Sequence, residues 1–424
     1  MVSIPEICRV EGHIDLLINM ENGKVKDVKA KCLEGNQILE KILIGRSFQE
    51  VPEISSRICG VCSIIHKLTS IQAIEDAFKV ELNEEIEALR KLVAYTGHLY
   101  SHIFHIFAMI YPDYTGNSLD SIFVESIRKH DFAKIVETIK AIRSATDILC
   151  GRAVHPITPV VGGFSKIPSK SNLVKVKLLL EKVLKTRDLL DHLLEGVSLD
   201  FTRRTEYLAL KGYGEIPILK GDICRLDGEI FDSRLFTDYI REIEVDYTTA
   251  RHFMLRNGRT YMVGAISRLN VNHEMLCEEA MELLNGHEIE FPCYSPFGNI
   301  VAQVLEIIHF TVQSISLIDE ILDMYPFKSS VEVTPREGIG LSVTEAPRGL
   351  LLHTYELDSN GRVQSVNIIT PTAQNLENLE ADVKAYIEYL IAKGDIENLK
   401  HRIEMLTRAY DPCMSCSARF AKAR

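Results

Sequence analysis

The hexapeptide RICGVC at residues 57–62 has a counterpart near the other end of the chain, DPCMSC at residues 411–416. Each contains a CxxC turn, which brings two sulfurs close enough to share one metal ion, and Gly60 is expected to permit the tight backbone that such a turn needs. Thiolates are soft ligands, so four of them suit zinc, iron or nickel. If both pairs hold the same metal, the fold must bring its two ends together.

Spacing alone leaves other interpretations open. One CxxC in isolation could be a redox dithiol, and four cysteines could hold a structural zinc ion. Zinc ribbons usually carry both pairs on one compact module, whereas these pairs are separated by almost the whole chain. The separation favours an active centre, and a scaffold protein with a structural zinc site is the alternative.

The composition narrows the class of protein. The chain has 424 residues, of which 46% are apolar, and a formal net charge of -11. Phosphate binding needs a basic face, so this charge argues against a nucleic-acid partner. The chain contains no run of about eighteen apolar residues, so no membrane span is predicted. A secretory signal sequence is not recognised at the start of the chain either. Ten cysteines are too sparse for a disulfide framework, which indicates a reducing, cytoplasmic environment.

Apolar periodicity predicts a mainly helical α+β fold, in one domain that spans residues 1–424. Residues 13–32 and 349–370 alternate around turns typical of β-hairpins, so small antiparallel sheets should flank long central helices. Apolar spacings of three and four predict helices near residues 63–80, 84–111, 132–150, 171–195, 234–255, 297–323 and 374–408.

The residues around the cysteines indicate a known family. The patterns RxCGxCxxxH and DPCxxC together closely resemble the signature motifs of nickel–iron hydrogenase large subunits. Further matches follow in the family's order: RVEGH at 9–13, SHIFH at 101–105, EAPRG at 345–349 and TPT at 370–372. The resemblance extends over nearly the whole chain and is greatest to the cytoplasmic, multimeric, sulfhydrogenase-type branch. It implies the fold of such subunits and the reaction H2 ⇌ 2H+ + 2e-.

The resemblance also implies the ligands of the metal centre. Cys59 and Cys413 would be terminal nickel ligands, and Cys62 and Cys416 would bridge nickel to iron. The iron would carry carbon monoxide and cyanide, installed by maturation proteins. Heterolytic cleavage of H2 gives a hydride and a proton, so a base must lie within reach. The candidates are Cys413 and Arg348.

Three residues would assist this chemistry. A guanidinium is normally cationic, so the safer role of Arg348 is electrostatic, with a hydrogen bond to one cyanide, and a surface ion pair is the alternative. Glu11 matches the family's proton-relay glutamate beside Cys413, and the alternative is a structural carboxylate next to Arg9. Thr372 matches a residue that hydrogen-bonds the second cyanide, and the alternative is an ordinary turn hydroxyl.

Other residues are expected around the ligands. His66 would present an N–H that tunes the charge on the bridging thiolates, and Arg57 opens the first motif. His102 and His105 lie three apart on a helix, so they share one face. We expect these two histidines to support the site or relay protons, with core packing as the alternative.

The family often holds a further magnesium or iron ion near the C-terminus, and Glu40 matches its carboxylate ligand. Arg419 stands where the family has a histidine ligand, and an arginine cannot ligate a metal. This second site is therefore either empty or built differently, for instance with the Arg419 guanidinium paired to Glu40. Family precursors are usually cleaved at this point, which would make residues 420–424 a removable extension, and the alternative is that this protein is not processed.

Two electrons must leave the site, yet the remaining cysteines lack the spacing of an iron–sulfur cluster. The resemblance therefore implies an iron–sulfur small subunit as a partner. Further electron-transfer subunits would serve a nicotinamide, ferredoxin or sulfur acceptor. Two related functions compete: a quinone-binding subunit of a respiratory proton pump, which lacks the four cysteines, and a hydrogen sensor, which keeps them.

Overall fold

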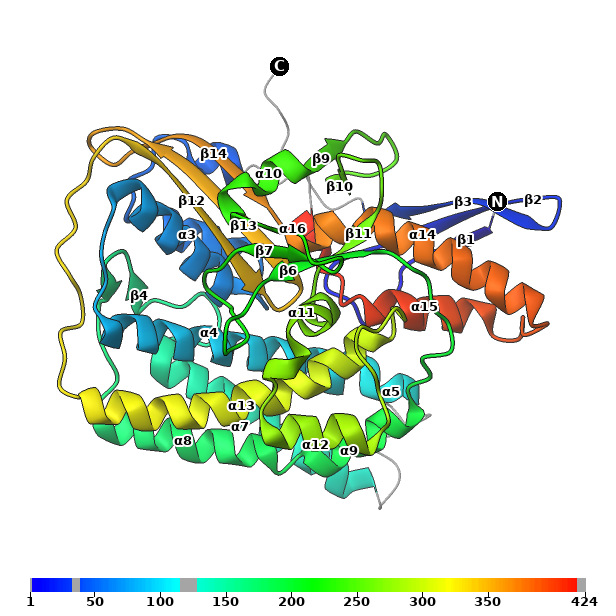
Figure 1. The fold of residues 1–424 in the computed structure, drawn as a ribbon, viewed down its shortest axis with the longest axis horizontal. Coiled ribbons are helices and arrows are strands. Elements are labelled where there is room, and N and C mark those ends of the chain that lie inside the picture. Colours follow the sequence, from blue (N-terminus) through cyan, green and yellow to red (C-terminus); the bar gives the residue numbers. More distant parts are fainter. Residues whose placement is uncertain (1, 33–38, 115–127, 418–424) are drawn as a thin grey trace.

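A computed structural model describes residues 2–32, 39–114 and 128–417. Long helices run along one side of the molecule and small sheets lie on the other, as Figure 1 shows. The helical side is built from α4 (Glu84–Phe104), α7 (Arg128–Cys150), α8 (Lys170–Leu184) and α13 (Gly298–Met324), which pack on one another. The mainly helical α+β fold is thus confirmed.

The other helices and helical turns lie outside this layer. They are α1 (Leu39–Leu43), α2 (Val51–Ser55), η1 (Ser56–Ile58), α3 (Ser63–Phe78), the π-helical turn η2 (His105–Ile110), α5 (Tyr111–Tyr114), α9 (Arg187–Gly196), η3 (Ser233–Leu235), α10 (Phe236–Tyr239), α11 (Ala265–Asn272), η4 (His273–Met275), α12 (Glu278–Gly286), α14 (Pro371–Ala392), α15 (Leu399–Ala409) and α16 (Met414–Ser417).

The strands form small separate sheets. They are β1 (Val2–Ile4), β2 (Asp15–Glu21), β3 (Lys24–Lys31), β4 (Pro159–Val160), β5 (Gly163–Phe164), β6 (Glu206–Leu210), β7 (Ile223–Arg225), β8 (Ile230–Phe231), β9 (Ile240–Ile243), β10 (His252–Leu255), β11 (Tyr261–Met262), β12 (Gly338–Ala346), β13 (Gly349–Leu357) and β14 (Val363–Ile369). The sheet orders are β1-β2-β3, β4-β5, β10-β9, β11-β6-β7-β8 and β12-β13-β14. All pairings are antiparallel as expected, except that β11 runs parallel to β6.

Helix α13 lies at the centre of the core, where it packs on α4, α8 and α11. Among the helices of the described ranges, it is the one long and apolar enough to cross a membrane by composition. However, 78% of its most apolar window is buried inside the protein. Its apolar surface is therefore used for packing against the neighbouring helices.

The hairpin of β12 and β13 positions the motif EAPRG. Its register pairs Ala346 with Gly349, which leaves Pro347 and Arg348 at the tip, and α3 packs across both strands. Gly349 has a φ of 122°, and a Cβ there would lie 2.6 Å from the backbone nitrogen of Gly264. Only glycine fits this conformation and this close approach, so the turn fixes the direction of Arg348.

The predicted helix at residues 234–255 is wrong. The segment folds as η3, α10 and the antiparallel pair β9–β10, with Ile240 opposite Leu255. Its apolar residues satisfy a helical spacing, but β-branched and aromatic side chains pack better on a half-buried sheet. The other predicted helices are present, although some are divided: Lys185 and Thr186 separate α8 from α9, and residues 393–398 separate α14 from α15.

A buried ion-pair cluster joins the helices to the hairpin. Arg268 on α11 lies 2.7 Å from Glu306 and 3.0 Å from Glu345, and all three side chains are almost fully buried. Its guanidinium also donates to the carbonyls of Ala346 and Pro347. Burial raises the pKa of Glu345 to about 7. Burial also acts to raise the pKa of Glu306, but the charges and hydrogen bonds of Arg268 and His102 together outweigh it and hold this pKa well below its usual range.

Substitution of Arg268 by methionine is therefore expected to destabilise the protein by about 3–5 kcal/mol, because it leaves two buried carboxylates without their cation. Chemical denaturation measures the change. Arg187→Met is the control, because its partner Glu282 is exposed and such pairs contribute only about 0–1 kcal/mol. Equal effects of the two substitutions would contradict the assignment of the cluster as a structural centre.

Candidate metal centre

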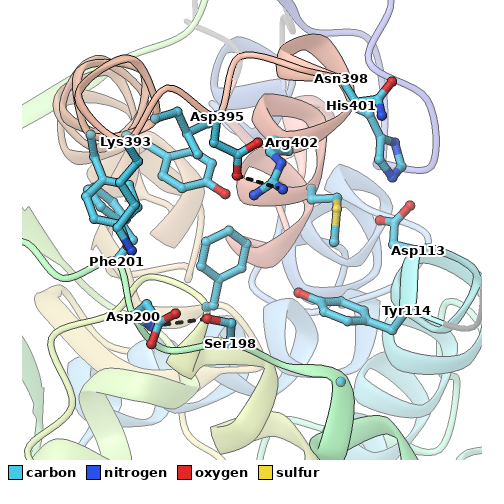
Figure 2. A pocket seen from close by; sticks show the side chains of 16 residues that line it. Asp113, Tyr114, Ser198, Asp200, Phe201, Lys393, Asp395, Asn398, His401 and Arg402 are labelled. Carbon is cyan, nitrogen blue, oxygen red and sulfur yellow. Dashed lines mark hydrogen bonds and ion pairs between the residues drawn. The ribbon is translucent and has the colours of Figure 1, made fainter.

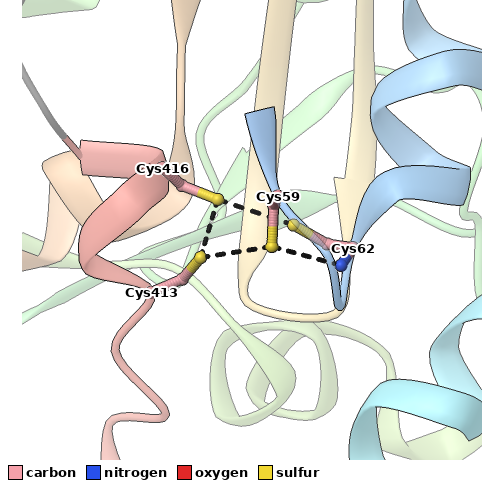
Figure 3. Close-up of side chains that lie close together, drawn as sticks. All are labelled: Cys59, Cys62, Cys413 and Cys416. Atoms are coloured by element: carbon pink, nitrogen blue, oxygen red, sulfur yellow. Dashed lines mark hydrogen bonds between the residues drawn. The ribbon is translucent and has the colours of Figure 1, made fainter. Parts of the chain in front are cut away.

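The two CxxC motifs meet in the core. Cys59 follows η1 in an extended conformation, Cys62 stands at the N-terminus of α3, and the second pair lies at the start of α16. The Sγ atoms are 3.4 Å apart for Cys59 and Cys413, 3.6 Å for Cys62 and Cys416, and 2.7 Å for Cys413 and Cys416 (Figure 3). Within the described ranges, these cysteines form the one group of three or more possible ligands that could surround a metal ion, and their sulfurs lie within 4.8 Å of one another.

The electrostatics of the cluster call for a cation. Burial raises the pKa of the Cys413 and Cys416 thiols well above the ordinary value. Hydrogen bonds from the other three thiols, that of Cys413 first, lower the pKa of Cys62. A thiolate on every cysteine would gather several negative charges in a dry site, which a bound metal would neutralise. The donor set therefore fits a thiophilic metal centre.

The N-terminal segment is hydrogen-bonded to the second motif. The backbone of Glu11 bridges to Cys413 and accepts from the nitrogen of Met414 at 2.9 Å. Its carboxylate accepts from the Ser415 hydroxyl at 2.6 Å and from the Ser415 backbone nitrogen at 3.2 Å. The same hydroxyl lies 3.7 Å from the Sγ of Cys413. Sequence reasoning missed Ser415, whose position between the two cysteines of the motif was the available signal.

The expected structural partner of Glu11 has a different role. Arg9 forms an ion pair with Asp113 and donates to the carbonyl of Met109. Asp113 also holds Arg408, at 2.6 Å. Arg9 is therefore paired with Asp113, whereas the carboxylate of Glu11 is hydrogen-bonded to Ser415 of the second cysteine motif.

Arg348 reaches the centre from the hairpin tip. It donates to the carbonyl and carboxylate of Asp411, at 2.6 and 2.7 Å, and its side chain is buried. Its second terminal nitrogen, Nη1, is buried without any partner. Although burial opposes it, the charges of Asp411 and of the thiols keep the pKa of Arg348 well above its ordinary value. A buried guanidinium N–H on a residue whose charge interacts with the thiols of Cys413, Cys62 and Cys59 fits a small anionic ligand on a metal, and a surface ion pair is excluded.

Thr372 supports the backbone of the second motif. Its hydroxyl oxygen, at the start of α14, accepts from the nitrogen of Cys413 at 3.1 Å. The neighbouring Thr370 donates to the carbonyl of Cys416 at 2.9 Å. The Thr372 hydroxyl hydrogen is still available to donate, because a hydroxyl can do both.

His66 contacts the cluster from α3, with Nε2 at 3.9 Å from the Sγ of Cys416. Arg57 and Gly60, in contrast, are exposed. Gly60 does not have a positive φ, and a Cβ there would meet nothing within 4 Å. The expectation that the turn itself requires glycine is therefore wrong, because the backbone conformation here is open to other residues.

The two histidines of the central motif are buried in separate networks. His105 contacts Gln303 at 2.6 Å, and Gln303 donates to Asp411 at 3.1 Å, so His105 is linked to the partner of Arg348. His102 contacts Glu306 at 2.8 Å in the Arg268 cluster. Neither is hydrogen-bonded to a cysteine within the described residues, so the expected supporting role of these histidines stays a prediction.

The described residues do not fit a second metal ion near Glu40. Its carboxylate accepts from the nitrogen of Ile368 at 3.1 Å, while the carbonyl of Ile368 accepts from Arg251 at 2.7 Å. Burial raises the pKa of Glu40 to about 6, and the charge of Arg251 opposes this rise. A guanidinium thus supplies the positive charge there. Arg419 and residues 420–424 lie outside the described residues.

A surface pocket of about 530 Å³ lies away from the cysteines, between the α14–α15 connection and residues 196–201 (Figure 2). Its walls include Phe201 and the ion pair of Arg402 with Asp395, at 2.9 Å. It shares no lining residue with the four-cysteine cluster.

Comparison with known proteins agrees with this geometry. The chain matches the family model for nickel-dependent hydrogenases over residues 37–147 and 258–419, which contain both cysteine pairs. The chain belongs to the nickel-dependent hydrogenase family. It is thus an oxidoreductase that acts on H2, and the sequence-based recognition of a hydrogenase large subunit is confirmed.

The similar proteins are subunits of multisubunit hydrogenases. Sulfhydrogenase 1 subunit alpha of Pyrococcus furiosus is 38% identical over 98% of this chain and 97% of its own length. Sulfhydrogenase 2 subunit alpha of the same organism is 31% identical over the whole of both chains. A solved NAD+-reducing NiFe-hydrogenase shares the fold with a TM-score of 0.87, at 22% identity and 98% coverage of both chains. The NiFeSe-hydrogenase of Desulfomicrobium baculatum has a TM-score of 0.81.

Proposed function

We propose that this chain cleaves H2 heterolytically and reversibly at a nickel–iron centre held by its four clustered cysteines. The observation that carries the proposal is the buried group of four sulfurs, together with the unpartnered Nη1 of Arg348, whose charge interacts with the thiols of that group. A structural zinc site would need the sulfurs alone, and would leave this guanidinium nitrogen unexplained. In this proposal all four cysteines would hold the group, Cys59 and Cys413 as terminal ligands and Cys62 and Cys416 as bridging ligands.

When bound, the nickel–iron group, with carbon monoxide and cyanide on iron, would supply the site at which H2 is polarised and its electrons are taken up. The side chains of the protein hold this group in place. Nη1 of Arg348 would donate to one cyanide, and the Thr372 hydroxyl would donate to the other. Maturation proteins would install the diatomic ligands.

The proton would leave through Cys413, Ser415 and Glu11. Arg348 remains cationic, so the Cys413 thiolate is the better base. Its sulfur and the carboxylate of Glu11 both contact the Ser415 hydroxyl, which can accept one proton while it donates another. Glu11 is only half-buried, so a proton on it can reach solvent.

Electrons would pass to an iron–sulfur small subunit, and from it to further electron-transfer subunits. The turn between Cys59 and Cys62 reaches the surface, because Arg57 and Gly60 are exposed. This places the buried centre close to solvent on one face. A partner that docks there would bring its cluster near the thiolates, and Arg57 would then contact the partner rather than the ligands.

Gly60→Tyr tests this docking face. We expect the variant to fold as the wild type does, because a Cβ at Gly60 meets nothing within 4 Å, yet to lose co-purification with the iron–sulfur subunit. Gly286→Tyr on α12 is the matched control, since it has equal room and no positive φ. Retention of the small subunit by both variants, judged by gel filtration, would show that the partner binds elsewhere.

The free state of all ten cysteines supports a reducing, cytoplasmic location. A core that includes residues from Ile4 to Cys416 supports a single domain.

A hydrogen sensor with the same motifs would show negligible turnover with an electron acceptor, which distinguishes it from the proposed enzyme.

Infrared spectroscopy of the anaerobically purified complex tests the central proposal. One carbonyl band and two cyanide bands are expected, together with nickel by elemental analysis. The opposite result would be zinc without nickel and no such bands, in protein made with its maturation machinery. That result would establish a scaffold with a structural zinc site.

A further inference from the structure

A hollow lined by three arginines lies at one end of the sheet that contains β6, β7 and β11 (Figure 1). Its volume is about 520 Å³. Residues 203–206 and 259–260 line it where the parallel strands β6 and β11 begin, and residues 226–227 line it where β7 has ended. Tyr294 completes the wall. None of these residues belongs to the four-cysteine cluster or takes part in the proposed reaction.

The carboxylates of this arginine-lined hollow are already ion-paired. Glu206 lies 2.7 Å from Arg259 and 3.5 Å from Arg225. Asp227 lies 2.7 Å from Arg225, which also pairs with Glu229. The acidic groups are thus held by arginines, so they do not make the hollow a site for a cation.

Two neighbouring arginines supply hydrogen-bond donors that the protein itself does not use. Arg204 has no carboxylate within ion-pair distance among the described residues, and its guanidinium lies over the ring of Tyr294 at 5.4 Å. Arg203 pairs with Asp382 through Nε and donates to Asn378 through Nη2. Its Nη1 makes no hydrogen bond to any residue of the described ranges. Free guanidinium N–H groups therefore face a site that already contains several positive charges.

The chemistry of these donors favours a phosphate group. Guanidinium groups in one hollow repel one another, and a bound anion offsets this repulsion. A phosphate offers several terminal oxygens, so it can accept from arginines on two sides at once, and the arginine fork matches its geometry. The aromatic ring beneath Arg204 orients the guanidinium before an anion arrives, which lowers the entropy lost on binding.

We propose that this hollow binds the phosphate of a small molecule, which accepts hydrogen bonds from Arg204 and Arg259. A volume of about 520 Å³ lies in the range of small-molecule sites, so an organic group fits beside the phosphate. Leu226 and the ring of Tyr294 supply the apolar part of the wall for that group. A nucleoside monophosphate has the required size and charge, and free phosphate shares the same recognition chemistry.

Isothermal titration calorimetry of the purified complex tests the proposal with three probes, which are inorganic phosphate, adenosine monophosphate and adenosine. We expect adenosine monophosphate to bind and adenosine, which lacks the phosphate, not to bind. Tighter binding of adenosine monophosphate than of inorganic phosphate would identify a nucleotide site. Equal affinities would identify the free ion as the ligand. Affinity should fall as salt is added, because the arginines are exposed.

The double variant Arg204→Gln and Arg259→Gln should weaken the binding of adenosine monophosphate about 10–100-fold, because charge-assisted hydrogen bonds are lost. Both side chains are exposed, so the variant should melt at the same temperature as the wild type. Arg187→Gln on α9 is the matched control, since this arginine does not line the hollow. Its affinity should equal that of the wild type.

The ring of Tyr294 provides a separate check on how Arg204 is oriented. Tyr294→Phe keeps the ring and should bind as the wild type does, whereas Tyr294→Leu removes it and should weaken binding about 2–5-fold.

Two results would overturn the proposal. One is the absence of binding of both inorganic phosphate and adenosine monophosphate at concentrations up to about 1 mM. The other is a double variant that binds adenosine monophosphate as tightly as the wild type, which would place the ligand elsewhere on the complex. Neither result depends on the metal centre, so this inference is tested independently of the proposed reaction.

Discussion

Cys413→Ser is expected to abolish hydrogen turnover and nickel binding together. The substitution keeps the size of the side chain but replaces a soft thiolate with a hydroxyl, which does not ionise at neutral pH and binds nickel poorly. The Sγ of Cys413 contacts those of both Cys59 and Cys416, so it stands at the centre of the ligand set. It is also the proposed base. Metal binding and proton removal should therefore both be lost.

The measurements are elemental analysis for nickel and turnover with an artificial electron acceptor. Cys224→Ser is the matched control, because Cys224 is a free, buried cysteine in β7 whose thiol donates to the backbone carbonyl of Arg225. We expect the control to keep nickel and activity. A Cys413→Ser protein that retained both would show that this cysteine is not a ligand.

Glu11→Gln should slow turnover by about 10²–10⁴-fold, the usual contribution of a positioned acid or base, while the metal centre stays intact. The amide has nearly the same shape as the carboxyl group, but it cannot take up the proton that the Ser415 hydroxyl delivers. Nickel content and the infrared bands should match the wild type. The loss should appear in turnover and in the exchange of H2 with deuterium from D2O, since both need the proton to leave.

Ser415→Ala provides an independent check of the same path. Ser415 is the residue that contacts both the sulfur of Cys413 and the carboxylate of Glu11, so its removal should also slow the exchange. Glu11→Asp keeps the acid on a shorter stem and should retain more activity than Glu11→Gln. Full exchange activity in Glu11→Gln would mean that the proton leaves by another route.

Local patterns were enough to predict much of the architecture. The helices α3, α4, α7 and α13 and the hairpin of β2 and β3 appear where apolar periodicity placed them. The helix prediction for residues 234–255 was wrong because their apolar spacing suits a short strand pair as well as a helix. Packing against distant segments decides between the two structures. The breaks inside the divided helices were missed for a related reason, since a break such as residues 393–398 disturbs the apolar periodicity of the sequence very little.

The sequence by itself determined the ligand atoms of the metal centre and its family, because CxxC spacing and the flanking motifs are local properties of the chain. The tertiary structure alone decided which groups surround those ligands. Asp411 beside Arg348, Ser415 between Cys413 and Glu11, and His353 behind His66 are contacts that depend on how α3, the β12–β13 hairpin and the C-terminal segment pack together. A hydrogen bond needs two atoms within about 3 Å, and no spacing along the chain can specify a distance between segments that meet only on folding.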